Sequence, residues 1–136
     1  MYKSVTNLEV RYYETDKMGI VHHSNYIRYF ECGRHQALAD LGLPVEKIEA
    51  MGYMLPVVSV QCNYKKSAIY GDVLRIESRI EKMPRVKLEV IAEIFNQKGE
   101  KLVDGKAEIA FMNPETRKPV RVPEFVLEVL RKYIDE

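Results

Sequence analysis

The chain has 136 residues, of which 46% are apolar and 30% charged, and its formal net charge is +1. This balance is typical of a folded globular domain and excludes a chain that is disordered along its length. The small net charge gives no electrostatic reason to expect nucleic acid or an anionic membrane as the main partner. No apolar run of about 18 residues is present, so no transmembrane segment is expected.

The two cysteines, Cys32 and Cys62, lack CxxC spacing and are interpreted as free thiols in a reducing compartment. The first residues, MYKSVTNLEV, contain no apolar stretch of the kind found in secretory signals. A cytoplasmic location is therefore expected. The length, and the lack of repeats or linkers, predict a single domain spanning residues 1–136.

In chain order, residues 5–13 alternate in part between apolar and polar side chains, which predicts a strand. From about 24 to 41 the spacing becomes helical. The apolar face of this helix is expected to consist of Tyr26, Ile27, Phe30, Ala37, Leu38 and Leu41, with Arg28, Glu31, Arg34 and Asp40 largely outside it. Ser24 or Asn25 can cap its start, and Gly42 can end it.

Gly33 lies inside this helix, where it costs roughly 1 kcal/mol relative to alanine. Its missing Cβ is interpreted as a point where the helix packs closely onto a sheet. A short second helix is expected at 44–51. Alternating strands are expected at 58–64, 74–80, 86–94 and 103–111, with turns at 70–72 and 96–99. A C-terminal helix is expected at Pro123, with an apolar side made of Val126, Leu127, Leu130 and Ile134.

One long helix followed by a meander of antiparallel strands predicts an α+β fold. The sheet is expected to wrap round the helix and bury its apolar side. One helix cannot cover every surface of such a sheet, and the edge strands need protection. The chain is therefore predicted to form a homo-oligomer.

The segment from Glu14 to Tyr26, ETDKMGIVHHSNY, places titratable residues in a turn that precedes the long helix. Asp16 can act as a general base toward water or attack a carbonyl directly. Unpaired N–H groups at the helix start, near His23, can hold an oxyanion, and Gly19 lets the backbone approach a ligand. These groups suggest a carbonyl-activating site without metal or organic cofactor. A commoner role for an acid before a helix is a cap or a surface charge, and this alternative stays open.

A family resemblance covers nearly the whole chain. It rests on Tyr12-Tyr13-Glu14-Thr15-Asp16, Gly19-Ile20-Val21, His23, Tyr26, Tyr29-Phe30-Glu31, Arg34, Tyr70-Gly71-Asp72 and the tail Lys118-Pro119-Val120-Arg121-Val122-Pro123. This pattern resembles the 4-hydroxybenzoyl-CoA thioesterase-like family, and within it the YbgC-type acyl-CoA thioesterases. The resemblance implies a hotdog fold, an antiparallel sheet wrapped around a long central helix with a C-terminal helix. It also implies homodimers with sites at the dimer interface, often paired into homotetramers.

The resemblance assigns roles by position. Asp16 matches the family's catalytic carboxylate, as base or nucleophile. The backbone N–H of His23 matches the amide that polarises the thioester carbonyl, and the His23 side chain matches a histidine with a supporting role. Tyr26 is expected to line the acyl pocket, and Gly19 and Val21 are expected in the substrate-binding turn.

Other basic groups near the motif have more than one interpretation. His22 stands where the family often has an aromatic residue, so the mouth of the site is expected to differ. His22 and His23 are expected to point to different sides and lack metal-ligand spacing, so no metal site is expected. Lys65, Lys66 and Arg85 can either meet the phosphates of coenzyme A or act as solvated charges.

The leading hypothesis is an acyl-CoA thioesterase that hydrolyses its substrate to a free acid and coenzyme A. Coenzyme A then enters as part of the substrate and is not a retained cofactor. One alternative is an acyl-thioester dehydratase or hydratase on the same fold, for which Asp16 and His23 would have to supply an acid–base pair. The other alternative is a non-catalytic oligomer that binds acyl-CoA.

Overall fold

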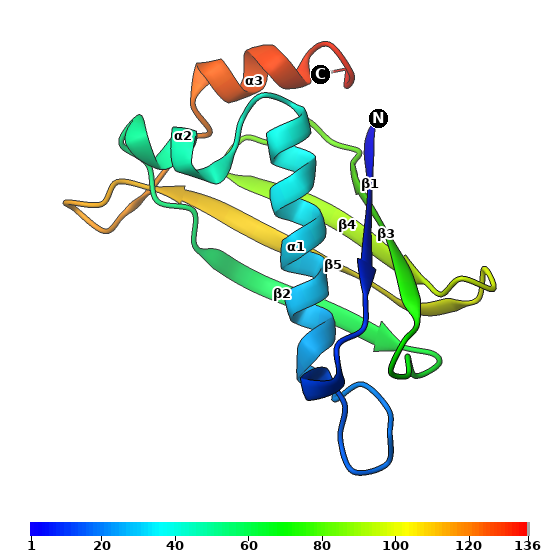
Figure 1. The fold of residues 1–136 in the computed structure, drawn as a ribbon. Helices are drawn as coiled ribbons and strands as arrows, with labels where there is room; N and C mark the ends of the chain where they lie inside the picture. Colours follow the sequence, from blue (N-terminus) through cyan, green and yellow to red (C-terminus); the bar gives the residue numbers. More distant parts are fainter. Residues whose placement is uncertain (136) are drawn as a thin grey trace.

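The structure, a computed structural model, describes residues 1–135 (Figure 1). Its elements in chain order are β1 (Tyr2–Glu9), the 3-10 helix η1 (Tyr12–Glu14), α1 (Ser24–Asp40), α2 (Val45–Ala50), β2 (Val57–Tyr64), β3 (Val73–Ile80), β4 (Lys87–Phe95), β5 (Lys101–Met112), β6 (Pro119–Val120) and α3 (Glu124–Leu130). None of these helices is long and apolar enough to cross a membrane, judged over the described residues.

The strands form one sheet in the order β1-β3-β4-β5-β2, and every neighbouring pair is antiparallel. The short strand β6 pairs with β5 away from this path. Figure 1 shows α1 lying across one face of the sheet, with α2 and α3 near its C-terminal end. The loop between η1 and α1 lies at the opposite end. The predicted antiparallel sheet around one long helix, with a C-terminal helix, is confirmed.

Two buried clusters hold α1 on the sheet. The cluster near the start of α1 includes Tyr26, Tyr29, Phe30, Leu74, Ile76, Ile94 and Val103. The cluster near its end includes Ala37, Leu38, Ile48, Ile80, Leu88, Phe111, Val126 and Leu130. Gly33 lies between them, and a Cβ there would meet Ile76 Cγ2 at 2.6 Å and Ser78 Oγ at 2.8 Å. The predicted close approach of the helix to the sheet is confirmed.

The expected buried face of α1 was wrong at two positions. Ile27 is 43% exposed, whereas Arg34 is only 7% exposed and lines a small cavity with Leu38 and Phe111. Burial lowers the pKa of the Arg34 guanidinium. The helical period orders side chains around the axis, but the placement of the sheet decides which positions at the margin become buried.

The first predicted strand, at 5–13, was placed too far along the chain, because β1 begins at Tyr2. β1 ends at Glu9, and a 3-10 turn follows because the Glu14 carboxylate accepts the Arg11 N–H at 2.8 Å. The Thr15 N–H also donates to the Tyr12 carbonyl at 3.1 Å. Local bonds of this kind compete with strand pairing, and here they turn the chain toward α1.

β2 departs from the expected pattern of one buried face. It forms an edge of the sheet and is exposed on both sides, with Val58 46%, Val60 38% and Tyr64 51% exposed. Within β2 only Cys62 is partly buried. By contrast, β3 and β4 alternate between buried and partly buried side chains, as predicted.

Candidate active site

The segment Thr15–His23 forms the loop before α1, at the end of the molecule away from α3 (Figure 1). The Asp16 N–H donates to the Ile20 carbonyl at 2.8 Å, and the Gly19 N–H donates to the Asp16 carbonyl at 3.1 Å. Gly19 has a φ of +79°, a conformation that glycine adopts without strain. Ile20 forms an isolated bridge with Ile69, which fastens the loop to the segment after β2.

Asp16 is partly exposed in this loop, and its two carboxylate oxygens differ. Oδ1 accepts the Met18 N–H at 2.8 Å, so the side chain caps its own turn and does not cap α1. Oδ2 makes no hydrogen bond or ion pair with the described residues. One carboxylate oxygen is therefore free for a ligand or a water molecule.

The start of α1 supplies an unpaired donor. The Asn25 N–H donates to the His22 carbonyl at 2.9 Å, and the Ser24 N–H lies 3.3 Å from His22 Nδ1. Within residues 1–135, the backbone N–H of His23 makes no hydrogen bond. An unpaired N–H at the positive end of a 17-residue helix is suited to donate a hydrogen bond to a negatively charged ligand oxygen.

Asp16 and His23 line the same cavity, which has a volume of about 320 Å³. Its other lining residues are Met18, Ile20, Val21, His22, Tyr26, Tyr64, Lys65, Lys66 and Ser67. The cavity thus brings together four of the predicted site residues: Asp16, Val21, His23 and Tyr26. Gly19 does not line it and lies on the exposed outer side of the turn.

Tyr26 forms a fixed part of the cavity wall. Its side chain is 3% exposed, and its hydroxyl accepts the Ala68 N–H at 2.9 Å. The Ala68 carbonyl in turn accepts the Val21 N–H at 2.9 Å. Burial raises the pKa of the Tyr26 phenol, so this hydroxyl stays neutral at ordinary pH. Tyr26 therefore joins α1, the loop and the segment after β2.

The sequence did not identify Tyr64 and Ser67 as site residues. The Tyr64 ring centroid lies 6.4 Å from that of His23 and 5.6 Å from that of Tyr26. Both missed residues lie at or after the end of β2, far from the motif in sequence. Long-range contacts, such as the bridge between Ile20 and Ile69 and the Val21 N–H bond to the Ala68 carbonyl, bring the two segments together. No local sequence pattern predicts these contacts.

The expected divergence of the two adjacent histidines was wrong. The rings of His22 and His23 lie 4.3 Å apart with an interplanar angle of 30°. The loop is irregular at this point, and His22 Nδ1 lies 2.8 Å from Ser24 Oγ, which turns the ring toward the helix. In the described part of the chain, no group of three histidine, cysteine or acidic side chains is arranged to hold a metal ion.

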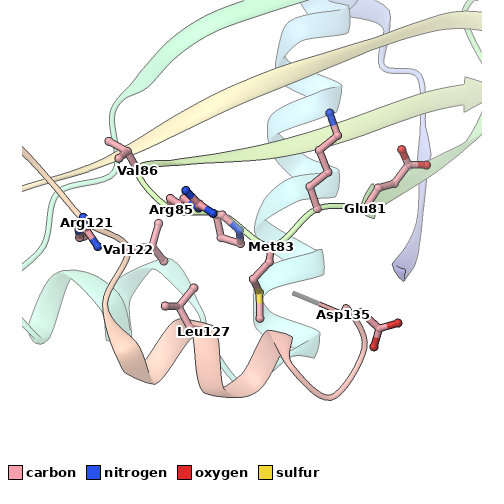
Figure 2. A pocket seen from close by; sticks show the side chains of 10 residues that line it. Glu81, Met83, Arg85, Val86, Arg121, Val122, Leu127 and Asp135 are labelled. Atoms are coloured by element: carbon pink, nitrogen blue, oxygen red, sulfur yellow. The ribbon is translucent and has the colours of Figure 1, made fainter.

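The three basic residues considered for phosphate contacts do not form one cluster. Lys65 lies 3.6 Å from Asp104, and Lys66 pairs with Glu100, at the mouth of the Asp16 cavity. Arg85 instead lines a cavity of about 590 Å³ between the β3–β4 connection and α3. Figure 2 shows Arg85 in that cavity with Met83, Arg121, Val122 and Leu127. Although this cavity is larger, no residue of the segment from Glu14 to Tyr26 lines it, so we place the candidate active site at Asp16.

The arrangement at Asp16 suits chemistry at an activated carbonyl. A carboxylate oxygen without a partner can activate water or attack carbon. An unpaired N–H at a helix start can stabilise the developing oxyanion. The wall formed by Val21, Tyr26 and Tyr64 offers apolar surface to an acyl group.

Comparison with known proteins identifies relatives along most of the chain. The sequence profile of the thioesterase-like superfamily matches residues 10–130. The putative acyl-CoA thioesterase YneP of Bacillus subtilis is 35% identical over 121 residues, which cover 89% of this chain and 88% of that protein. A putative esterase of Aquifex aeolicus is 37% identical over 122 residues, which cover 90% of this chain and 93% of that protein.

A solved structure extends the likeness to three dimensions. The crystal structure of DHNA-CoA thioesterase from Staphylococcus aureus matches with a TM-score of 0.85 and 36% identity. The match covers 98% of this chain and 84% of that one. Sequence and fold together show that the chain belongs to the thioesterase-like superfamily, with the hotdog fold, and is a thioester hydrolase.

Proposed function

We propose that the protein is an acyl-CoA thioesterase, acting as a single domain, that hydrolyses its substrate to a free acid and coenzyme A. The observation that carries this proposal is the pairing of two unused groups in one cavity. Oδ2 of Asp16 and the N–H of His23 have no partner among the described residues, and both residues line the 320 Å³ cavity. A thioester carbonyl bound between them would meet a base or nucleophile and an oxyanion donor.

The proposed reaction uses each group once. The thioester oxygen accepts the His23 N–H, and the helix dipole stabilises the negative charge that develops on it. Removing one donor of this kind typically lowers kcat by about 10²–10³-fold. Asp16 either takes a proton from the attacking water or attacks the carbonyl carbon itself. The C–S bond then breaks, and coenzyme A leaves as a thiolate that is protonated by solvent.

Isotope labelling and chemical trapping together distinguish the two routes for Asp16. In a single turnover in H₂¹⁸O, a general base leaves ¹⁸O only in the released acid. A nucleophile forms an anhydride, and if water then attacks the acyl carbon, the released acid again carries ¹⁸O. Water attack on the Asp16 carbonyl instead leaves ¹⁸O in the peptide that contains Asp16. Trapping with hydroxylamine separates the first two cases, because only the anhydride yields a modified Asp16.

The substrate class is supported by the lining and by the named relatives. Val21, Tyr26 and Tyr64 offer apolar and aromatic contact for an acyl group. Relatives at 35% and 36% identity carry the names putative acyl-CoA thioesterase and DHNA-CoA thioesterase. Lys65 and Lys66 lie at the mouth, where they can meet phosphates, although each already pairs with an acid.

We also propose that the protein works as a homodimer or a dimer of dimers. β2 is an edge strand with apolar side chains exposed on both faces, including Val57, Val58 and Val60. An uncovered edge of this kind favours pairing with a second strand. Light scattering at micromolar concentration tests this proposal. A monomeric mass would refute it, and Val60→Lys should shift a dimer toward monomer.

Product analysis tests the reaction. Purified protein is incubated with short-chain, long-chain and aromatic acyl-CoAs, and free thiol and acid are measured together. Equal amounts of both products support hydrolysis. A changed acyl group without thiol release would indicate a dehydratase or hydratase, and saturable binding without any product would indicate a binding oligomer.

A further inference from the structure

A buried carboxylate lies two residues before Asp16 and has no part in the proposed reaction. Glu14 is 5% exposed, although the other two residues of η1, Tyr12 and Tyr13, are largely exposed. Its Oε1 accepts the Tyr29 hydroxyl at 2.9 Å and the Arg11 N–H at 2.8 Å. The Arg11 guanidinium lies 3.5 Å from Oε2. Tyr29 itself is 1% exposed, on the second turn of α1.

The backbone of Glu14 makes a second set of contacts. Its carbonyl accepts the side-chain N–H of Asn25 at 2.9 Å, and Asn25 is 6% exposed on the first turn of α1. The same carbonyl accepts the His22 N–H at 2.9 Å. Glu14 therefore binds the first two turns of α1 and also the residue directly before His23.

These contacts join the two ends of the active-site loop. Asp16 follows Glu14 by two residues, and His23 follows His22 directly. A shift of Glu14 relative to α1 would move the Asp16 carboxylate relative to the His23 N–H. The two arms of the loop are also paired with each other, through the bridge between Thr15 and Val21 and the Asp16 N–H bond to the Ile20 carbonyl. The side-chain bonds between Glu14 and Tyr29 and between Asn25 and Glu14 fasten this pair to α1, where the His23 N–H lies.

The buried hydrogen bond between Tyr29 and the Glu14 carboxylate is better explained by a need for fixed geometry than by a gain in stability. A buried carboxylate needs several donors to offset the loss of hydration, and an apolar pair of similar volume is often at least as stable. Burial, and then the hydrogen bond to Glu14, raise the pKa of the Tyr29 phenol. Tyr29 therefore remains a hydrogen-bond donor over the whole working pH range.

We propose that Glu14, Tyr29 and Asn25 are positioning residues, which set the distance between the Asp16 carboxylate and the His23 N–H. This inference rests on the proposed function. The three residues act through Asp16 and His23 and do not touch the substrate. A misplacement of about 1 Å at a reacting group can lower the rate about 10²-fold. Their loss should therefore lower kcat with little effect on KM.

Tyr29→Phe tests the proposal, with Tyr2→Phe as the matched control. Each variant removes one buried hydroxyl that donates to a fixed acceptor, since the Tyr2 hydroxyl donates to the Ala37 carbonyl at 2.8 Å near the other end of α1. Tyr29→Phe should lower kcat by about 10- to 100-fold with KM within about twofold of wild type. Tyr2→Phe should keep the wild-type kcat although it loses a comparable amount of stability.

Two further positions, Glu14 and Asn25, test whether a loss of kcat comes from lost positioning and not from misfolding. Glu14→Gln keeps an oxygen acceptor for Tyr29 and Arg11, so it should retain more activity than Glu14→Ala. Asn25→Ala removes the tie to the Glu14 carbonyl and should also lower kcat more than KM. If Tyr29→Phe keeps the wild-type kcat, or changes only KM, the positioning role is overturned.

A second readout separates this inference from the proposed function. Amide hydrogen exchange over residues 15–23 is measured in wild type, Tyr29→Phe and Tyr2→Phe, and it needs no substrate. Faster exchange in Tyr29→Phe alone supports the positioning role even if wild type hydrolyses no tested thioester. If exchange in Tyr29→Phe equals that of wild type, the positioning role is overturned. If wild type also hydrolyses no tested thioester, the proposed function is overturned with it.

Discussion

Gly33→Ala has two opposing effects on the free energy of unfolding. Alanine in the middle of a helix is more favourable than glycine by about 1 kcal/mol. The new Cβ, however, would lie 2.6 Å from Ile76 Cγ2 and 2.8 Å from Ser78 Oγ. Ile76 is fully buried in β3 and β-branched, so its methyl group cannot rotate away without strain.

The cost of overpacking is expected to exceed the gain in helix propensity, so Gly33→Ala should be less stable than wild type. Overpacking a well-filled core typically costs about 1–3 kcal/mol. Two contacts below 3.0 Å place this site near the upper end, so a net loss of roughly 2 kcal/mol remains after the helix term is subtracted. Urea unfolding followed by circular dichroism measures the change in the free energy of unfolding.

A control in the same helix isolates the helix term. Ala39 is exposed on α1, so Ala39→Gly should cost about 1 kcal/mol without any packing change. If Gly33→Ala is more stable than wild type while Ala39→Gly shows the expected loss, α1 does not press against β3 at Gly33, and the packing argument is wrong.

Two further predictions concern stability. Tyr26→Phe removes the acceptor of the buried Ala68 N–H and should lower the free energy of unfolding by about 1–3 kcal/mol; an unchanged thermal midpoint would contradict this hydrogen bond. The Lys101 ammonium and then the Arg79 guanidinium lower the pKa of the Glu93 carboxyl in the folded protein. Their stabilising effect is therefore fully present above the pKa that Glu93 has in the unfolded chain, and it is lost as the pH falls through the lower pKa of the folded state. Glu93→Gln should therefore lower the urea midpoint at pH 7 and match wild type at about pH 2, and a constant difference across this range would contradict the assignment.

Much of the fold could be predicted because its strands bury one face. The side chains of β3 and β4 alternate strictly between buried and partly buried positions, so a period of two was visible in the sequence. The same logic failed at β2, which pairs only with β5 and lies at the edge of the sheet. The alternation of β2 in the sequence therefore does not correspond to a buried face within the described chain.

The part of the candidate site that is contiguous in the sequence could be predicted. Asp16, Val21, His23 and Tyr26 lie within one turn and the helix start, and local chemistry together with the family resemblance singled them out. Tyr64 and Ser67 reach the cavity through long-range contacts such as the bridge between Ile20 and Ile69. Local sequence patterns do not predict contacts of this kind.

The burial of Glu14 was equally hidden from the sequence. The alternation of residues 5–13 suggested that the chain remains extended up to this point, where a charged side chain would be solvated. Its true environment depends on α1 docking Tyr29 and Asn25 against the end of η1.

The most direct measurement of the central proposal is thiol release by wild type and Asp16→Asn on the best acyl-CoA of the panel. Asp40→Asn, the same change on an exposed acid at the end of α1, serves as the control. Wild-type turnover is expected in the control, and loss of turnover is expected in Asp16→Asn, with the fold retained by circular dichroism. A folded Asp16→Asn protein that keeps more than a few per cent of wild-type activity would contradict the assigned role of Asp16.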